Sequence, residues 1–423
     1  MPHLGSLCEL VYPYRMLNRI KLVLMAALGL ASVVAAWRSG SDFETLHRAA
    51  VLAAQGQAAS ALSLAPNLAL TPFTLTWLMP LGFLPFTAAK MLWLLGQLMT
   101  LALFWSGMGK LYPQSRPAGS FLPWLFIFVL SVNPLHGQFM RGDLTLALFT
   151  VLLWAEIFSL SGGVLGGTVA GVLVAGAVAT RIFPVWILAY YWLGRGRAER
   201  QGIIAGALLA VLSSYLVFGS QTSLLYFEFY KTLTIHTDTS LFQQWDSLQN
   251  VPAGVYRVLV ASGKEAQAAV VTQYAFALCF ALVSYLGFRR RQSYAFEGDQ
   301  SRNLWALAMA MSALFCAEAR PHYYMFYLPA IGGLLEQASL RRANGFSAVG
   351  PWVAVLAFTL TVGLTAESVV GKGWNHVLQA ANIPLFGMGI VVLAGWAELS
   401  RCFLSDRILT NQRLLNMRHH GGI

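Results

Sequence analysis

Residues 20–48 read IKLVLMAALGLASVVAAWRSGSDFETLHR, and this stretch decides how the rest of the chain is interpreted. Its first part, residues 20–37, is a long apolar run. Its second part places two acids, Asp42 and Glu44, among basic residues directly behind that run. Charged residues make up only 11% of the 423 residues, so a charged cluster at this position is unusual. It is either an ordinary polar connection after a membrane span or a functional group at a membrane surface.

The composition indicates the fold class. Hydrophobic residues make up 57% of the chain, whereas soluble domains contain about 45–50% apolar and about 25% charged residues. Several runs are long enough to cross a hydrocarbon layer of about 30 Å, which takes about 20 apolar residues. The sequence therefore predicts an all-α polytopic membrane protein with about 10–13 transmembrane helices.

The expected spans follow the apolar runs, with both termini on one side. They cover residues 20–37, 87–107, 120–133, 144–160, 164–180, 185–194, 202–219, 266–288, 303–317, 325–338, 350–366 and 382–400. The first run could also pass for a signal peptide, but a first membrane helix fits better in a chain with so many later spans. We expect a single integral membrane domain over residues 1–423, with a tail at 401–423.

The net charge of +11 agrees with this topology. The dense arginine clusters, including Arg195–Arg200 and Arg289–Arg291, all fall on one side, which is therefore cytoplasmic by the positive-inside rule. The chain lacks a basic stripe interleaved with aromatic residues, so nucleic acid is not an expected partner. The four cysteines have neither zinc-site nor disulfide-framework spacing.

The segment 38–86 is expected to lie outside, on the membrane face. Its first half, Leu46 to Leu64, has helical periodicity and is predicted to form an interfacial amphipathic helix. Four prolines follow among apolar residues, which favours a re-entrant helix-turn-helix over a straight span. They are Pro66, Pro72, Pro80 and Pro85.

Unusual polar residues from separate segments collect on the same external side, at the ends of spans. They are Asp42 and Glu44, Arg141 and Asp143, Arg181, His236 and Asp238, and Arg320 and His322. Charges in such positions are costly and tend to be functional. For each residue a plain structural role is the alternative, such as a helix cap for Asp42 or an interfacial histidine beside Tyr323 for His322.

This set suits group transfer from a lipid phosphate. An attacking hydroxyl needs one positioned carboxylate to take its proton, and a phosphate leaving group needs cations such as arginine. A transporter or flippase is the main alternative, but it predicts charges near the bilayer midplane on broken helices. An envelope scaffold subunit is another alternative, and it would not require the carboxylate.

The order of several short motifs resembles glycosyltransferase family 87, the polyprenol-phosphate-dependent mannosyltransferases of the membrane GT-C class. The motifs are Ser41-Asp42-Phe43, Leu81-Gly82-Phe83-Leu84-Pro85, the Asn133–Gln138 turn, Arg181-Ile182-Phe183-Pro184, Asp246–Asn250 and Arg320-Pro321-His322-Tyr323. The family's Gly-Gln-x-Asn is altered here. Either Gly137-Gln138 lacks its Asn, or Gly142-Asp143-Leu144-Thr145 replaces the motif.

The resemblance implies an inverting transfer of a sugar, usually mannose, from a polyprenyl-phosphate donor to a lipid or glycan acceptor on the extracytoplasmic face of the cell membrane. Carried over by position, Asp42 is the general base with Glu44 in reserve, and His322, Arg320 and Arg181 contact the donor phosphate. Residues expected to line the substrate site are Arg141, Gln138, Asp143, His236 and Asn250. No cofactor is expected.

The scarcity of external acids and the lack of an Asp-x-Asp pair predict that transfer needs no divalent metal. The purified protein is expected to keep its full transfer rate in EDTA, measured by the appearance of glycosylated product. Loss of activity in EDTA that Mn²⁺ or Mg²⁺ restores would contradict this.

Overall fold

The computed structural model describes residues 5–38, 41–64, 70–112, 121–181, 185–236, 250–292, 298–315, 321–363, 365 and 367–420. Within these ranges every regular element is helical, which confirms the all-α membrane fold class. Four described helical stretches are long and apolar enough to cross a membrane: Phe86–Leu111, Gly163–Thr180, Arg197–Lys231 and Ile383–Arg401. The predicted total of about a dozen crossings stays a prediction.

The helices follow the apolar runs of the sequence. The first half of the chain contains α1 (Gly5–Arg38), α2 (Ser41–Ala54), α3 (Ala58–Leu64), α4 (Pro72–Gly82), α5 (Phe86–Leu111), α6 (Phe121–Arg141), α7 (Thr145–Leu160), α8 (Gly163–Thr180), α9 (Val185–Gly194) and α10 (Arg197–Phe218). The second half contains η3 (Gly219–Gln221), α11 (Thr222–His236), α13 (Val251–Ala261), α14 (Glu265–Gln292), α15 (Gly298–Leu314), η4 (Pro321–Tyr327), α16 (Leu328–Ala343), α17 (Val349–Phe358), η5 (Thr359–Gly363), α18 (Glu367–Ala380) and α19 (Ile383–His420).

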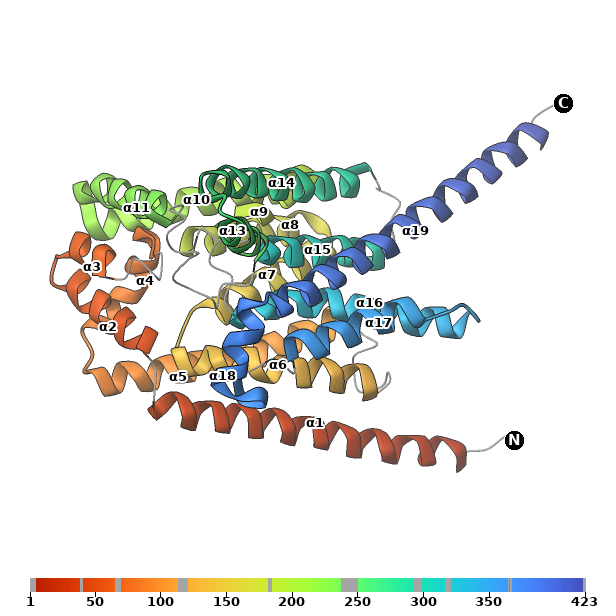
Figure 1. Cartoon of the computed structure of the whole chain (residues 1–423), viewed down its shortest axis with the longest axis horizontal. Coiled ribbons are helices and arrows are strands. Elements are labelled where there is room, and N and C mark those ends of the chain that lie inside the picture. The colour runs from red at the N-terminus through yellow and green to blue at the C-terminus, as the bar shows by residue number, and fades with distance from the viewer. Residues whose placement is uncertain are drawn as a thin grey trace.

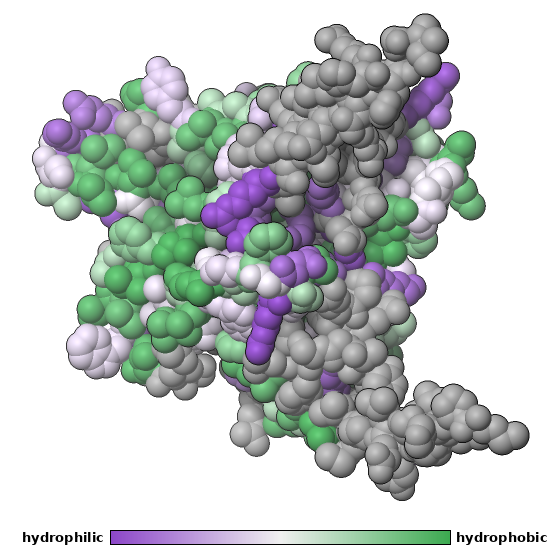
Figure 2. All heavy atoms as spheres, turned by 90° about the vertical axis from the view of Figure 1, so that its right-hand side faces the viewer, coloured by the Kyte–Doolittle hydropathy of each residue, from purple (hydrophilic) through white to green (hydrophobic). Residues whose placement is uncertain are grey.

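The helices α2, α3, α4 and α11 gather at one end of the molecule, on the left of Figure 1, while α1 begins and α19 finishes at the opposite end. Figure 2 looks onto that opposite end, where hydrophilic side chains gather near the middle of the face. The long helices run between the two ends. The exposed sides of α5 and α10 carry apolar residues, as expected of helices that face lipid; examples are Met91, Leu95, Met99, Leu208, Leu212 and Leu216.

A small second core holds the short helices together at the left-hand end of Figure 1. Its buried residues come from α2, α3, α4, α11 and the segment just before α4: Leu46, Ala49, Ala50, Ala53, Ala58, Ala61, Leu62, Leu70, Leu75, Leu78, Leu225 and Phe229. Gly82 at the end of α4 lets this helix approach α2, because a Cβ there would lie 2.3 Å from the Ala50 carbonyl oxygen. The N-terminal end of α4 docks on α8, since the Thr71 and Thr74 hydroxyls donate to the carbonyls of Ala179 and Thr180.

Two sequence predictions, one for the segment 41–64 and one for α6, were wrong in detail. The predicted single helix from Leu46 to Leu64 is two helices that start earlier, at Ser41, and are separated at Gly56, which has φ +77°. Asp42 therefore lies in a helical turn and not in a loop. The predicted turn at Asn133–Gln138 lies inside α6, which continues through Pro134 to Arg141. Membrane helices can accommodate a proline where neighbouring groups satisfy the backbone groups that it frees.

Close packing of α8 against α10 depends on glycines. A Cβ added at Gly171 would lie 2.1 Å from the Glu199 carbonyl oxygen, and one at Gly202 would lie 2.1 Å from the Thr168 carbonyl oxygen. Small residues allow helix backbones to approach in this way, and van der Waals packing then holds the helices together in a membrane.

We expect Gly202→Leu to destabilise the protein by about 1–3 kcal/mol or more, because the side chain has no space between the two backbones. Thermal unfolding of the purified protein in detergent measures the effect. Gly176→Leu in α8 is the matched control, since a Cβ at Gly176 meets no atom within 4 Å. Equal unfolding temperatures for the two variants would contradict this account of the interface.

Candidate active site

The site is built around the turn that joins α6 to α7. The helix α6 ends in a positive-φ glycine, Gly142 (φ +74°), whose N–H donates to the Gln138 carbonyl at 2.9 Å. This is the usual way to close a helix, and glycine adopts it without a steric penalty. A Cβ at Gly142 would also lie 2.8 Å from the Cβ of Phe43. The start of α2 therefore packs directly against this turn.

The residue after the turn, Asp143, forms a buried ion pair with Arg181 at the end of α8. The Arg181 Nη1 lies 2.9 Å and 3.2 Å from the two carboxylate oxygens, and each side chain is 5% exposed. The Leu144 N–H donates to Oδ1 at 2.6 Å and the Thr145 hydroxyl donates to Oδ2 at 2.9 Å. A buried pair needs such additional hydrogen bonds to offset the cost of desolvation. The pair joins the start of α7 to the end of α8.

Two glutamines hold the backbone of Asp143. The Gln97 side chain of α5 donates to the Asp143 carbonyl at 3.3 Å, and the Gln138 side chain of α6 donates to the same oxygen. Both glutamines are buried. The predicted substrate residue Gln138 is therefore a support for Asp143, and four helices converge on this one residue.

The segment that contains His322 reaches the same place. The Arg181 guanidinium carbon lies 5.8 Å from the ring centroid of Tyr323, which is within the range of a cation–π contact. Tyr323 belongs to η4 and directly follows His322 in the chain. Arg320 and the side chain of His322 lie outside the described residues. Tyr323, the residue directly after His322, thus lies against Arg181.

The two acids of α2 have different surroundings. Glu44 is exposed and pairs with Arg48 one helical turn later, at 2.6 Å. Asp42 is half-buried, and its neighbour Phe43 is fully buried, with its ring centroid 5.4 Å from that of Trp93. Acids in the first turn of a helix also interact favourably with the helix dipole. Phe43, which lies between the two acids, packs against Gly142, and of the two acids Asp42 is the less exposed.

The other predicted site residues fall in three groups. Arg141 is half-buried at the last position of α6, where a cation interacts favourably with the helix dipole. Asn250 is buried and caps α13, since its Oδ1 accepts the Ala253 N–H at 2.7 Å, which is a structural role. The side chain of His236 and the whole of Asp238 lie outside the described residues. Among the described residues, no group of three His, Cys, Asp or Glu side chains could hold a metal ion.

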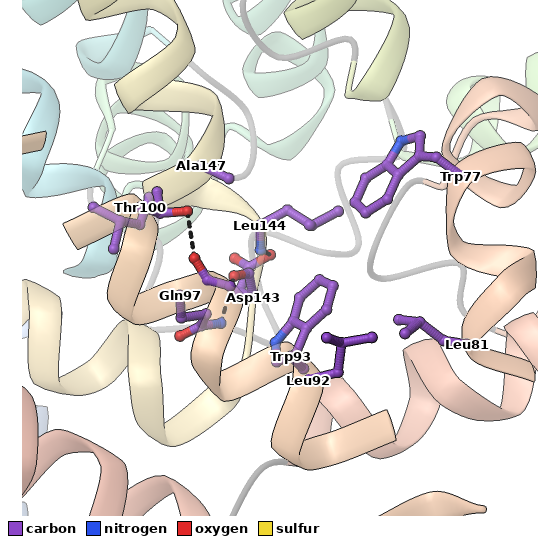
Figure 3. A pocket seen from close by; sticks show the side chains of 11 residues that line it. Trp77, Leu81, Leu92, Trp93, Gln97, Thr100, Asp143, Leu144 and Ala147 are labelled. Carbon is purple, nitrogen blue, oxygen red and sulfur yellow. Dashed lines mark hydrogen bonds between the residues drawn. The ribbon is translucent and has the colours of Figure 1, made fainter. Parts of the chain in front are cut away.

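A cavity of about 300 Å³ adjoins the ion pair (Figure 3). Trp77 and Trp93 stand at one side of it, with their rings parallel to within 3° and their centroids 6.5 Å apart. The Trp93 N–H donates to the Gly142 carbonyl at 3.1 Å, so this wall is fixed to the central turn. The lining residues are Trp77, Leu81, Leu92, Trp93, Gly96, Gln97, Thr100, Asp143, Leu144, Leu146 and Ala147.

Comparison with known protein families identifies the family of the chain. The family model of glycosyltransferase family 87 matches residues 71–316, more than half of the chain. The chain belongs to glycosyltransferase family 87. No curated protein and no solved structure matches it. The matched range contains Asp143 and Arg181, whereas Asp42 and His322 lie on either side of it.

Sequence reasoning missed several residues that shape the site of this glycosyltransferase. Trp93 and Gln97 lie inside an apolar span and were not singled out, although a polar residue within such a span is itself an indication of a functional site. Sequence reasoning also did not single out Arg257 of α13, whose Nε donates to the Asn382 side chain at 3.2 Å and so links α13 to the connection between α18 and α19. Asn382 has a positive φ of 57°, between α18 and α19. Nothing in the local sequence around Arg257 indicates this long-range contact.

A second buried charge cluster lies at the other end of α7. Glu156 accepts hydrogen bonds from Tyr191 at 2.9 Å and Arg290 at 3.1 Å, and it also pairs with Arg195. Glu156 lies 13 residues after Asp143, which is about 20 Å at 1.5 Å per residue along the helix. The arginines Arg195 and Arg290, expected in basic loops, are buried here. This cluster joins α7, α9 and α14 away from the active site.

We expect Arg181→Ala to destabilise the enzyme by about 3–5 kcal/mol, because it leaves the buried Asp143 carboxylate without its cation. Thermal unfolding in detergent is the measurement. The control is Arg48→Ala, which removes the exposed pair with Glu44 and should change stability by at most about 0.5 kcal/mol. Unchanged stability of Arg181→Ala would contradict the importance of this pair.

Proposed function

We propose that this glycosyltransferase moves a mannosyl residue from a polyprenyl phosphate to a hydroxyl of a lipid-linked or glycan acceptor. One observation carries the proposal. Phe43, which follows Asp42 in the chain, packs against Gly142 beside the buried Asp143–Arg181 pair. Tyr323, which follows His322 in the chain, packs against Arg181 of the same pair. The chain neighbours of Asp42 and His322 therefore both lie beside this pair, which supports a reaction that needs one carboxylate and cations around a phosphate.

Asp42 acts as the general base. It takes the proton of the acceptor hydroxyl, whose oxygen attacks the anomeric carbon of the sugar from the face opposite the phosphate. The bond between this carbon and the phosphate oxygen breaks, and polyprenyl phosphate leaves with the electron pair, so the anomeric configuration inverts. The half-buried position of Asp42 supports this role better than the exposed position of Glu44.

The donor phosphate binds chiefly to His322 and Arg320, and Arg181 is a further partner. Asp143 neutralises much of the Arg181 charge, so Arg181 contributes as a second partner and fixes the position of η4 through Tyr323. Arginine suits this role because its planar guanidinium binds phosphate oxygens in a bidentate way.

The site works at the extracytoplasmic face of the cell membrane, with both chain termini in the cytoplasm. The arginine clusters support this orientation, because the positive-inside rule assigns basic segments to the cytoplasm. Arg195 and Arg290 lie at the far end of α7 from the active site. The beginning of α1 and the end of α19 lie at the end of the molecule opposite α2 (Figure 1).

The test is transfer from polyprenyl-phosphate mannose to a membrane lipid extract by the purified enzyme, with the product identified by mass. We expect Asp42→Asn to lower the rate by about 10²–10⁴-fold, the usual contribution of a general base. Glu44→Gln is the matched control on the same helical turn, and it should keep the wild-type rate.

Three results would overturn parts of this proposal. Wild-type activity of Asp42→Asn excludes this residue as the base, and selective loss in Glu44→Gln transfers the role to Glu44. Activity with a nucleotide sugar but not with polyprenyl-phosphate mannose excludes the donor. A faster reaction with polyprenyl-phosphate glucose than with the mannose donor excludes the sugar.

A further inference from the structure

Six arginines meet at the end of the bundle opposite the candidate active site. At this end α9 crosses α14 closely, because a Cβ added at Gly194 would lie 2.7 Å from the Gly287 carbonyl oxygen. Three arginines follow each of these glycines within six residues along the chain. They are Arg195, Arg197 and Arg200 after Gly194, and Arg289, Arg290 and Arg291 after Gly287. The crossing therefore brings two basic segments together.

The buried acids at this crossing do not balance the six arginines. Arg290 lies 3.1 Å from Oε1 of Glu156, and Arg195 pairs with Oε2 of the same carboxylate. One carboxylate therefore serves two guanidinium groups. The other described acid here, Glu199, is buried at the start of α10 and accepts the Ser159 hydroxyl at 2.8 Å. Six arginines thus share two described carboxylates, which leaves an excess of positive charge.

Four of the six arginines remain accessible. Arg197 and Arg291 are exposed, while Arg200 and Arg289 are half-buried. The Nε of Arg200 donates to the Trp192 carbonyl at 2.8 Å, so this side chain is held at the end of α9. A positive excess at a surface attracts anions, and the planar guanidinium groups bind phosphate oxygens in a bidentate way. The crossing is therefore suited to a phosphate group.

Exposed aromatic residues lie about one helical turn before the arginines on both helices. Trp192 of α9 is 41% exposed, and Tyr285 and Phe288 of α14 are 47% and 50% exposed. The Tyr285 ring stacks on Trp396 of α19, with the ring centroids 5.9 Å apart. Tryptophan and tyrosine gather at the headgroup level of membranes. An apolar surface beside a basic one fits a phospholipid better than a free phosphate ion, which has no acyl chains to cover the aromatic residues.

We propose that this crossing binds the phosphate headgroup of an acidic phospholipid, with Arg197 of α10 and Arg291 of α14 as its exposed ligands. Basic pockets between membrane helices bind acidic headgroups in this way. The bound phosphate offsets the repulsion among the arginines and joins the connection between α9 and α10 to the end of α14. The inference rests on the fold alone and does not depend on the proposed transfer reaction.

Lipid binding to the purified full chain in detergent tests this, measured by native mass spectrometry. The probes are phosphatidylglycerol and phosphatidylcholine with identical acyl chains. The wild type should bind phosphatidylglycerol the more tightly, because only this lipid carries a net negative charge. Arg197→Gln/Arg291→Gln should weaken phosphatidylglycerol binding by about 30-fold, since each basic residue near an acidic lipid contributes about fivefold. Phosphatidylcholine binding should not change.

Arg19→Gln/Arg342→Gln is the matched control. It removes two arginines that are also exposed, on α1 and α16, and lowers the net charge by the same amount. Its affinity for phosphatidylglycerol should stay close to that of the wild type. An equal loss in the two glutamine variants indicates attraction to the net charge alone and overturns the site. Equal binding of the two lipids by the wild type overturns it as well.

Thermal unfolding separates a lipid site from a site for a free anion. Phosphatidylglycerol should raise the unfolding temperature of the wild type but not that of Arg197→Gln/Arg291→Gln, because a ligand stabilises only the protein that binds it. The same rise with inorganic phosphate alone would show a site for a free anion and overturn the lipid assignment.

Arg197→Lys/Arg291→Lys separates the role of charge from damage to the fold. This variant keeps both positive charges, although lysine binds a phosphate only as a point charge. It should retain most of the phosphatidylglycerol affinity of the wild type. A loss as large as that in Arg197→Gln/Arg291→Gln would contradict a site that depends on positive charge.

Discussion

The arrangement of the candidate active site depends on one interaction, the buried ion pair between Asp143 and Arg181. Two charges in this position are stable only because the surrounding helices supply further partners, the Leu144 N–H and the Thr145 hydroxyl on the carboxylate and Gln97 and Gln138 on the backbone. These partners come from α5, α6 and α7, while Arg181 ends α8. Satisfying one carboxylate therefore fixes the ends of four helices relative to one another.

Two segments that lie outside the family-matched range, one on each side of it, pack against this ion pair and the turn beside it. The start of α2 reaches it through Phe43, which fits against Gly142 because that residue has no side chain. The start of η4 reaches it through Tyr323, which faces the Arg181 guanidinium. The proposed base Asp42 and the proposed phosphate partner His322 thus belong to segments that pack against the core, and each is one residue away from an aromatic anchor.

The two ends of the membrane bundle use buried charge differently. At the far end, buried Glu156 pairs with Arg195 and Arg290 and accepts a hydrogen bond from Tyr191, and this cluster joins α7, α9 and α14. At the near end, the Asp143–Arg181 ion pair borders a cavity of about 300 Å³, and two of the residues that line it, Trp77 and Leu92, are exposed. The candidate active site is therefore the end of the bundle at which buried charge borders this cavity.

The sequence by itself determined the fold class, the family and the places of many helices. The expected spans 144–160, 164–180 and 185–194 agree within one residue with α7, α8 and α9, because hydrophobic runs and the glycines or charges between them are local signals. Only the tertiary structure decided that Asp143 pairs with Arg181, 38 residues away, that Asn250 caps a helix, and that Glu44 faces solvent. Hydropathy indicates which segments enter the membrane. The partner of each charged residue depends instead on which helices are neighbours, and side-chain packing across the bundle determines that neighbourhood.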